Sequence, residues 1–430
     1  MRQQCLYIRA IVVASSCILG AAAVAAPTGP DFTKPFFGCD RTVGAVPMLS
    51  ILWDPHRPTD PAPAKQDVER LLFGKQHSVA GYFRENSYRQ FRVTNAGVLG
   101  WYDAAKPADH YWGAPDEKDG DGDGFVNGHV EKWTEAIRRA DKSFDFARYD
   151  RDHDGTLSTR ELAVHIIIPQ NGSFGTNRGT AGREYPTVEP LVVDGVQVPV
   201  IAESYLGAPP DLAVVVHELA HLMLNAPDMY FPFAYPYGAG SYSLMDWHGH
   251  LSHLDPFLKL RLGWARARIV TESGWQTLAA VEKHPEVLVL IDPRHSTSEY
   301  FIVENRWPKD SYEQALPDAG LSVWQIVDDA KALGSIPAPR GCDPSQWATV
   351  GADDWGRRAA RMIRPVFLPQ RDDKLALWDG SDPATGYDLR PLSCRPERAT
   401  LRWADGSPSC FRLRHIPAAG PVMRFWVGME

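Results

Sequence analysis

The sequence predicts an α+β fold whose C-terminal region is rich in β-strands, and three observations support this prediction. The chain has 430 residues, of which 44% are hydrophobic and 23% charged, so it is long enough for about two domains that each bury a core. Apolar strand patterns alternate with helical patterns up to about residue 268. Beyond that point, short apolar runs separated by turn residues follow one another, which is typical of β-structure.

The composition and charge exclude several classes of protein. Disordered, collagen-like and coiled-coil proteins have a different composition. The 45 Lys and Arg residues are outnumbered by 53 Asp and Glu residues, and no basic stripe stands out, so nucleic acid is not an expected partner. No apolar run after residue 26 approaches the roughly 20 residues that span a bilayer, so we expect no membrane partner after removal of the N-terminal segment.

Residues 1–25 are predicted to be a signal peptide. Arg2 and Arg9 supply a positive start, residues 10–19 an apolar stretch, and residues 23–25 a small-residue cleavage site. A buried N-terminal helix is the alternative, but it does not explain why the segment contains no acidic residue. We therefore expect a secreted protein, with the periplasm as the other possible destination, and a short N-terminal segment at residues 26–44.

The four cysteines beyond the signal peptide are consistent with export. An oxidising compartment favours disulfides, and four cysteines allow three pairings. Cys394 and Cys410 are close in sequence, so we expect them to pair, which leaves Cys39 with Cys342. A zinc site made of cysteines is disfavoured because the chain contains no Cys-x-x-Cys pair.

Hydrophobic periodicity and turn residues predict the helices and strands outside the motifs described below. Strands are predicted at 45–53, near 90–102 and at 163–168, and helices at 66–73, 77–86 and 129–143. Asp194-Gly195, between two alternating runs, indicates a β-hairpin. Further strands are predicted at 276–281, 286–292, 299–303 and 321–327.

A zinc-binding motif lies in the helical pattern at residues 211–224. His217 and His221 are four residues apart, so their side chains lie one turn apart on the same helix face and can bind one zinc ion. Glu218 lies beside them and can accept a proton from a water on the zinc. The alternative is a pair of buried core histidines, each of which would need its own polar partner.

The residues after this helix favour a catalytic zinc site. A catalytic zinc ion takes three protein ligands and leaves one position open. Asn225 can adopt the left-handed conformation that ends a helix, and Asp228 then offers a carboxylate as third ligand, with Asp246 and Asp255 as alternatives. Met245 lies in a predicted tight turn, as in the Met-turn of metzincins, although a methionine is more often plain core.

The chain resembles the immune inhibitor A-like family of secreted zinc metalloproteases over most of residues 45–330. The matching blocks are HSVAGYFRENSYRQFRVTNAGVLGWY (77–102), HELAHLMLNAPDMY (217–230), SYSLMDW (241–247), HLDPFLKLRLGW (253–264), SEYFIVENRW (298–307) and AGLSVWQIVDD (319–329). The chain departs from the family in having Leu224 where a glycine is usual and a Pro-Asp pair that falls one residue later. The family also often carries a long propeptide, whereas only about 20 residues separate the predicted cleavage site from the first strand of the catalytic domain here.

The resemblance implies the organisation and activity of the chain. It implies a metzincin-like zinc protease domain at residues 45–268 and a β-rich C-terminal region at residues 269–430. It also implies a zinc ion held by His217, His221 and Asp228, with Glu218 as general base. Protein or peptide substrates are the expected partners.

Two acidic, glycine-punctuated loops lie within residues 115–161 and are predicted to bind calcium. The second has oxygen donors at EF-hand spacing, with glycine at position six: Asp150, Asp152, Asp154, Thr156, Ser158 and Glu161. The first begins in the same way, with Asp119, Asp121, Asp123 and Asn127, but has Val130 at position twelve. The loops could pair like EF-hands or form a local calcium clamp before the strand at 163–168, and a solvated acidic turn is the remaining alternative.

The sequence therefore predicts a secreted zinc endopeptidase with structural calcium. One alternative is a catalytically inactive, calcium-dependent binding or adhesion protein on a protease scaffold, and another is a zinc hydrolase that acts on a non-peptide bond. Tyr230, Tyr242 and His253 are close enough in sequence to stabilise an oxyanion, but ordinary packing is the preferred interpretation of each.

Overall fold

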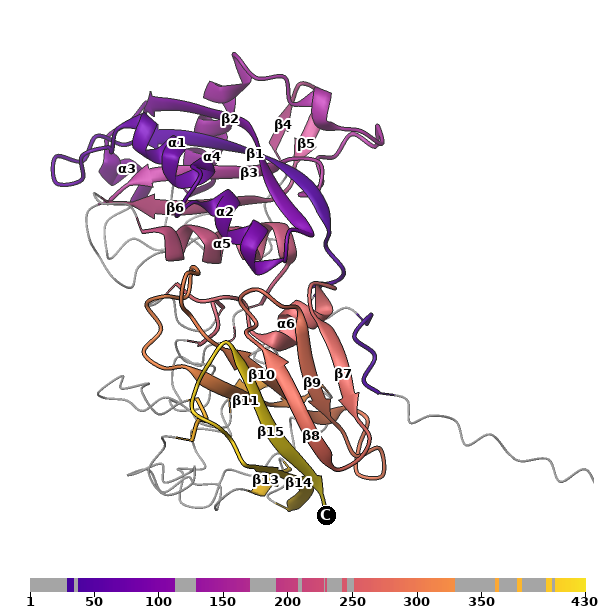
Figure 1. Ribbon diagram of the computed structural model, residues 1–430. Helices are drawn as coiled ribbons and strands as arrows, with labels where there is room; N and C mark the ends of the chain where they lie inside the picture. The colour runs from indigo at the N-terminus through magenta and orange to yellow at the C-terminus, as the bar shows by residue number, and fades with distance from the viewer. Residues whose placement is uncertain are drawn as a thin grey trace, which may run out of the picture.

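The computed structural model describes most of the chain and shows mixed α/β structure with several sheets (Figure 1). The described residues are 29–34, 38–112, 129–170, 191–207, 211–227, 229, 242–245, 251–328, 360–362, 377–380, 400–403 and 407–430. The signal-peptide prediction lies outside them.

The N-terminal part is built on a parallel sheet with strand order β2-β1-β3-β6. Its strands are β1 (Gly44–Asp54), β2 (Phe91–Asp103), β3 (Ala163–Pro169) and β6 (Ile201–Leu206). Every residue of β3 is buried, because elements cover both faces of this sheet. The strands predicted at 45–53 and 163–168 are confirmed, whereas the segments near 90–102 form one continuous strand whose register against β1 shifts after Met48.

Alternate residues of β1 point to two different cores. Met48 and Leu52 pack with α1 (Lys65–Phe73), α2 (Val79–Asn86) and α5 (Leu212–Leu224).

A helix and a β-hairpin pack on the other face of the sheet. Leu49 and Ile51 pack with α4 (His129–Asp141) and with the hairpin of β4 (Leu191–Val193) and β5 (Val196–Val198). The short helix α3 (Ala108–Trp112) contributes Tyr111 to the same core. The predicted hairpin turn is confirmed, since Asp194 and Gly195 both have positive φ angles.

The C-terminal part contains two mainly antiparallel sheets, and buried side chains from both of them form one hydrophobic cluster. The first has the order β12-β11-β10-β9-β7 and the second β13-β14-β15-β8. The elements are α6 (Pro256–Arg261), β7 (Arg266–Val270), β8 (Gly274–Ala279), β9 (Glu286–Leu290), β10 (Glu299–Arg306), β11 (Gly320–Val327), β12 (Ala360–Met362), β13 (Thr400–Arg402), β14 (Pro408–Arg414) and β15 (Val422–Met429). All four strands predicted from 276 to 327 are confirmed to within a few residues.

The two parts meet below α2 and α5 and share a hydrophobic core (Figure 1). Tyr82 and Val216 from the upper part belong to the same cluster of buried residues as Phe257, Tyr300 and Trp324 from the lower part. Packing is therefore continuous across the predicted domain boundary at 268/269, and that boundary stays a prediction.

Hydrogen bonds also join the two parts. The Tyr82 hydroxyl donates to the Ser252 carbonyl at 2.7 Å, and the Tyr88 hydroxyl donates to the Val281 carbonyl at 2.6 Å. These bonds hold α2, and the segment after it, against the β-rich part.

A cluster of charged side chains lies at this junction. Its members are Glu85, His253, Lys259, Glu282, Glu304, Arg306 and Glu313, and all but Glu85 are buried. Arg306 donates to Glu304 at 2.8 Å and to Glu313 at 2.6 Å. Burial raises the pKa of Glu282 to about 8, and the negative charge of Glu313 adds to this effect. The carboxylates of the cluster outnumber its cations.

We expect this carboxyl group to make the protein less stable as the pH rises. Between pH 4.5 and about 8 the folded protein keeps a proton on Glu282 that the unfolded chain has released, so the free energy of unfolding falls with pH by at most about 1.4 kcal/mol per unit. Glu282→Gln should flatten the dependence. Denaturant titrations from pH 5 to 7.5 test this, and equal slopes for the variant and the parent would contradict it.

Candidate functional site

The predicted zinc motif lies on α5, whose ends are set by local capping. The Asp211 carboxylate accepts a hydrogen bond from the Ala213 N–H at 2.8 Å, and Asn225 ends the helix in the left-handed conformation with φ of 52°. Every residue of α5 except Leu212 and His221 is buried. The predicted bounds of the helix and its stop at Asn225 are confirmed.

His217 and His221 converge on one point. Their Nε2 atoms lie 3.2 Å apart, and their ring planes are nearly perpendicular at 89°. Two zinc–nitrogen bonds of about 2.0–2.1 Å at a tetrahedral angle would place the nitrogens about 3.3 Å apart. The spacing of the two rings therefore fits a shared zinc ion.

The outer nitrogens of both rings are held by backbone carbonyl groups. His217 Nδ1 donates to the Leu244 carbonyl at 2.9 Å, and His221 Nδ1 donates to the Ala226 carbonyl at 2.6 Å. Since a carbonyl can only accept, each Nδ1 carries the proton and each Nε2 presents a lone pair. Two lone pairs 3.2 Å apart repel each other unless a cation lies between them, so the donor set fits a metal ion.

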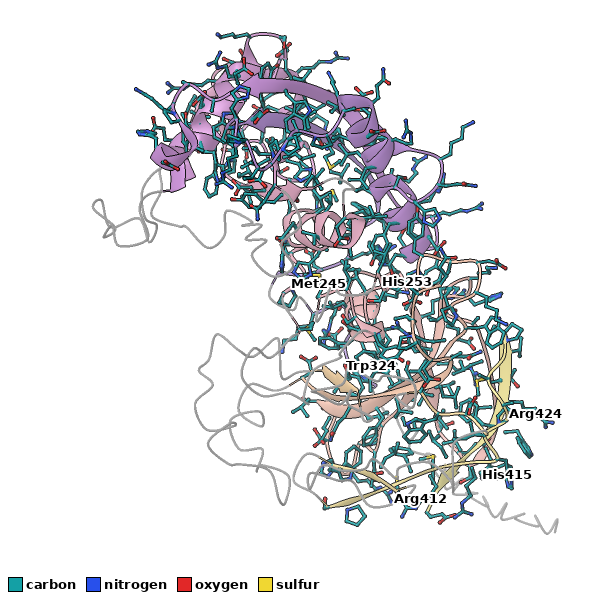
Figure 2. All side chains as sticks on the ribbon, turned by 90° about the vertical axis from the view of Figure 1, so that its left-hand side faces the viewer. Met245, His253, Trp324, Arg412, His415 and Arg424 are labelled. Carbon is teal, nitrogen blue, oxygen red and sulfur yellow. The ribbon has the colours of Figure 1, made fainter. Side chains whose placement is uncertain are left out.

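Two further predicted residues of this site, Glu218 and Met245, lie among the described residues. Glu218 is 4% exposed on the same helix, next to His217. Met245 is fully buried in a turn, as predicted, and its carbonyl accepts a hydrogen bond from the Met229 N–H at 2.6 Å. Figure 2 shows Met245 near the level at which the upper and lower parts meet. We call residues 242–245 the methionine turn.

The identity of the third ligand stays a prediction. Asp228 lies outside the described residues, as do Tyr230 and Asp246. The bond between Met229 and Met245 nevertheless ties the neighbour of Asp228 to the methionine turn.

The alternative third ligand Asp255 has another role. It is fully buried, caps α6 through the Leu258 N–H at 3.0 Å, and accepts a hydrogen bond from the Ser243 hydroxyl at 2.8 Å. Both carboxylate oxygens thus hold α6 and Ser243 in place, which gives Asp255 a structural role.

The two described candidates for oxyanion stabilisation are packed in the interior. Tyr242 and His253 are both fully buried. His253 Nε2 lies 3.0 Å from Glu85, and its Nδ1 lies 3.0 Å from the Lys259 ammonium. Burial, then the charges of Lys259 and Arg306, lower the pKa of His253 well below 6.5, so its ring is neutral.

The predicted calcium loop brings three aspartates together. The carboxylates of Asp150, Asp152 and Asp154 each offer an oxygen within 4.8 Å of the others. Asp150 is 7% exposed; its Oδ2 accepts a hydrogen bond from the Gly155 N–H, whereas its Oδ1 is buried with no hydrogen-bond partner. A buried carboxylate oxygen without a partner is costly, so this oxygen fits a bound cation.

The last predicted ligand, Glu161, is not part of this group of oxygens. Its carboxylate accepts bonds from the Arg151 N–H at 2.8 Å and from the Ser158 hydroxyl at 2.8 Å. Burial acts to raise the pKa of Glu161, but these hydrogen bonds outweigh it and leave the pKa below 4.5. Glu161 is thus an ionised group held within the loop.

The surroundings of the loop differ from those of a helix–loop–helix EF-hand. A 3₁₀ turn (Ala147–Tyr149) precedes the loop, and β3 follows it. The Leu157 N–H donates to the Gln197 carbonyl at 2.8 Å, and the Gln197 N–H donates to the Gly155 carbonyl at 2.9 Å. The loop therefore joins the β4–β5 hairpin to the start of β3, which favours the local clamp among the two predicted arrangements.

The other predicted calcium residues, Asp119, Asp121, Asp123 and Asn127, lie outside the described residues, so the first loop stays a prediction. Thr156 and Ser158 lie in the described loop. The Thr156 N–H donates to Asp154 at 2.7 Å.

We expect calcium to protect the fold without taking part in the chemistry. Removing calcium while zinc remains saturating should lower the melting temperature and speed autolysis. Calcium at about 100 times its dissociation constant stabilises the folded state by about 2.7 kcal/mol, which corresponds to a shift of roughly 3 °C for a chain of this length. Asp150→Ala combined with Glu161→Ala should reproduce this loss in a thermal melt.

The matched control is Asp119→Ala in the first loop, which lacks an acidic residue at position twelve and should do less damage. The prediction is wrong if the double variant melts at the parent temperature in millimolar calcium, or if Asp119→Ala proves more damaging.

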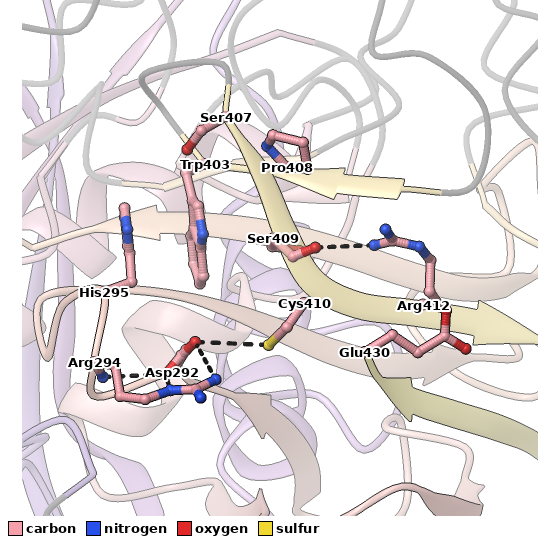
Figure 3. Close-up of a pocket in the computed structure, with 10 residues that line it drawn as sticks. All are labelled: Asp292, Arg294, His295, Trp403, Ser407, Pro408, Ser409, Cys410, Arg412 and Glu430. Atoms are coloured by element: carbon pink, nitrogen blue, oxygen red, sulfur yellow. Dashed lines mark hydrogen bonds and ion pairs between the residues drawn. The ribbon is translucent and has the colours of Figure 1, made fainter.

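A hollow of about 610 Å³ lies on the β-rich part and contains none of the predicted site residues (Figure 3). Trp403 stacks on His295 at its wall, with ring centroids 4.2 Å apart. Cys410 also lines it, with a thiol 3.8 Å from Asp292, and burial raises the pKa of this thiol. Its predicted disulfide partner Cys394 lies outside the described residues, as does Cys342, the predicted partner of Cys39.

Comparison with models of known protein families gives no match, and comparison with curated proteins gives none either. The resemblance to the immune inhibitor A-like family therefore stays a prediction. In the described part of the chain, no helix combines the length and apolar character needed to cross a membrane.

Proposed function

We propose that the protein is a secreted zinc-dependent endopeptidase. The observation that carries this proposal is the geometry of the two histidines. Their Nε2 lone pairs meet at 3.2 Å while both Nδ1 protons are given to backbone carbonyls, and Glu218 follows His217 directly on the same helix.

The proposed roles follow from the position of each side chain. His217, His221 and Asp228 would hold the zinc ion, which, when bound, would acidify water and polarise the substrate carbonyl. Glu218 accepts a proton from the attacking water and later delivers it to the departing amine. Because Glu218 is buried, the packing around it restricts the rotamers of its side chain.

Structural calcium is the second part of the proposal. Asp150, Asp152 and Asp154 would bind the ion through carboxylate oxygens, and the buried Oδ1 of Asp150 supports this assignment. The bound ion would fix the loop that joins the β4–β5 hairpin to β3.

A digestion assay separates this proposal from its alternatives. The protein is incubated with casein or gelatin, with and without a zinc chelator, and its metal content is measured. We expect proteolysis that the chelator abolishes and added zinc restores. Stoichiometric zinc without proteolysis would indicate a hydrolase of a non-peptide bond, whereas calcium without zinc would indicate the inactive binding protein.

A further inference from the structure

We infer that Glu313 and Asp255 are positioning residues for His217 and act on it through the methionine turn. This inference rests on the proposed zinc site. Neither carboxylate touches the histidine, and Glu313 belongs to the β-rich part, between β10 and β11. The zinc site would therefore be supported in part by residues far beyond the HExxH helix in sequence.

The backbone of Leu244 connects His217 to the residues that position it. Its carbonyl accepts the proton of His217 Nδ1 at 2.9 Å, and its N–H donates to the His253 carbonyl at 3.0 Å. The backbone of Leu244 is thus held through both its carbonyl group and its N–H group. Its position sets both the tautomer of His217 and the direction of the Nε2 lone pair.

Glu313 accepts a hydrogen bond from His253, the residue whose carbonyl group binds the Leu244 N–H. Its Oε1 accepts the His253 N–H at 2.8 Å and Arg306 Nη1 at 2.6 Å. Arg306 is the last residue of β10, and its Nε donates to Glu304 on the same strand at 2.8 Å. The backbone at His253 is therefore tied to a paired strand of the lower sheet.

The ring of His253 adds a second restraint at the same residue. The Lys259 ammonium donates to Nδ1, and Nε2 lies 3.0 Å from the Glu85 carboxylate on α2. Figure 2 shows His253 near Met245, with Trp324 of β11 further into the β-rich part. The backbone and side chain of His253 thus connect the methionine turn to both parts of the molecule.

Asp255 supports the methionine turn one residue away. The Ser243 hydroxyl donates to Asp255 Oδ2 at 2.8 Å and accepts the Met245 N–H at 3.3 Å. The other oxygen of Asp255 caps α6 through the Leu258 N–H. The two carboxylates therefore restrain Leu244 from both sides, Asp255 through Ser243 and Glu313 through His253.

The charge of the junction explains why a carboxylate is suited to this position. Glu313 has two strong donors on one oxygen, and the bond from Arg306 is charge-assisted and therefore stronger than a neutral one. A glutamine at this position keeps the size but loses the charge. Its effect on His217 can therefore be separated from a loss of packing.

Zinc affinity is the measurement that tests the inference. It is determined by competition with a chromophoric chelator in a Glu218→Gln parent, which prevents autolysis. Ser243→Ala and Glu313→Gln should each weaken zinc binding by about 10- to 100-fold, as is usual when the support of a metal-binding histidine is lost. The absorption spectrum of the cobalt-substituted protein should shift in both variants, because it reports the geometry of the ligands.

The matched control is Glu282→Gln, which changes a buried carboxyl group of the same cluster whose Oε1 accepts the Trp307 N–H and does not contact the methionine turn. We expect its zinc dissociation constant to stay within twofold of the parent value. A merely structural role would lower the melting temperature of the zinc-free variants without changing the zinc dissociation constant or the cobalt spectrum.

The possible outcomes are distinct. A parent that binds zinc, with Ser243→Ala and Glu313→Gln binding it equally tightly, overturns the inference and leaves the proposed function intact. A parent that binds no zinc overturns both. If Glu313→Gln does not fold, Ser243→Ala decides the role of Asp255, and Glu313→Asp, which keeps the charge but shortens the reach to the His253 N–H, decides the role of Glu313.

Discussion

Glu218→Gln should abolish proteolysis while zinc stays bound. The amide cannot accept a proton from the attacking water, and general acid–base groups of this kind contribute about 10²- to 10⁴-fold to a rate. The histidines and their carbonyl partners at Leu244 and Ala226 are unchanged by the substitution. Digestion of casein and zinc content are measured on the same preparation.

The control for this experiment is Glu69→Gln, which makes the same chemical change on the exposed side of α1. It should retain parent activity. A Glu218→Gln protein that keeps a tenth of the parent rate would contradict the role of Glu218 as general base, and one that loses its zinc would show a role in metal binding.

Asp228→Ala should remove most of the bound zinc and, with it, most of the activity. Two histidines leave a site with too few ligands to hold the ion, because catalytic zinc takes three protein ligands. Asp228 lies outside the described residues, and the alternative Asp255 holds hydrogen bonds from Ser243 and Leu258.

Zinc content after dialysis checks this expectation. Asp109→Ala, at an exposed aspartate of α3, is the matched control and should leave zinc content and activity unchanged. If Asp228→Ala keeps both zinc and activity, the third ligand lies elsewhere. Asp246→Ala would then be the next variant to measure.

The sequence by itself predicts the elements that depend on local patterns. The helix that carries His217 and His221 follows from its apolar run, the capping Asp211 and the stop at Asn225, all of which act within a few residues. The i, i+4 spacing of His217 and His221 places both rings on one face of any α-helix, whatever surrounds it. The spacing of Asp150, Asp152 and Asp154 in their acidic loop is likewise a local property.

The strand order and the shared core could not be read from the sequence. Hydrophobic alternation shows that β1 and β3 are strands, but the hydrogen bonds between strands join backbone groups that are the same for every residue. The parallel order β2-β1-β3-β6 depends instead on how the crossover helices pack. The continuity of the core past residue 268 depends on the same long-range packing.

The hydrogen-bond partners that hold the histidines of the candidate site are visible only in the tertiary structure. His217 and His221 are visible in the sequence as an HExxH motif, but their proton acceptors are the backbone carbonyls of Leu244 and Ala226. A backbone carbonyl leaves no signal in residue type. Glu313 lies 60 residues after the His253 N–H that it holds, and a buried carboxylate at that separation finds its donors only once the chain has folded. The sequence thus specifies the two histidines of the candidate site, and the fold specifies their protonation and direction, because hydrogen bonds to the backbone depend on distances that only folding creates.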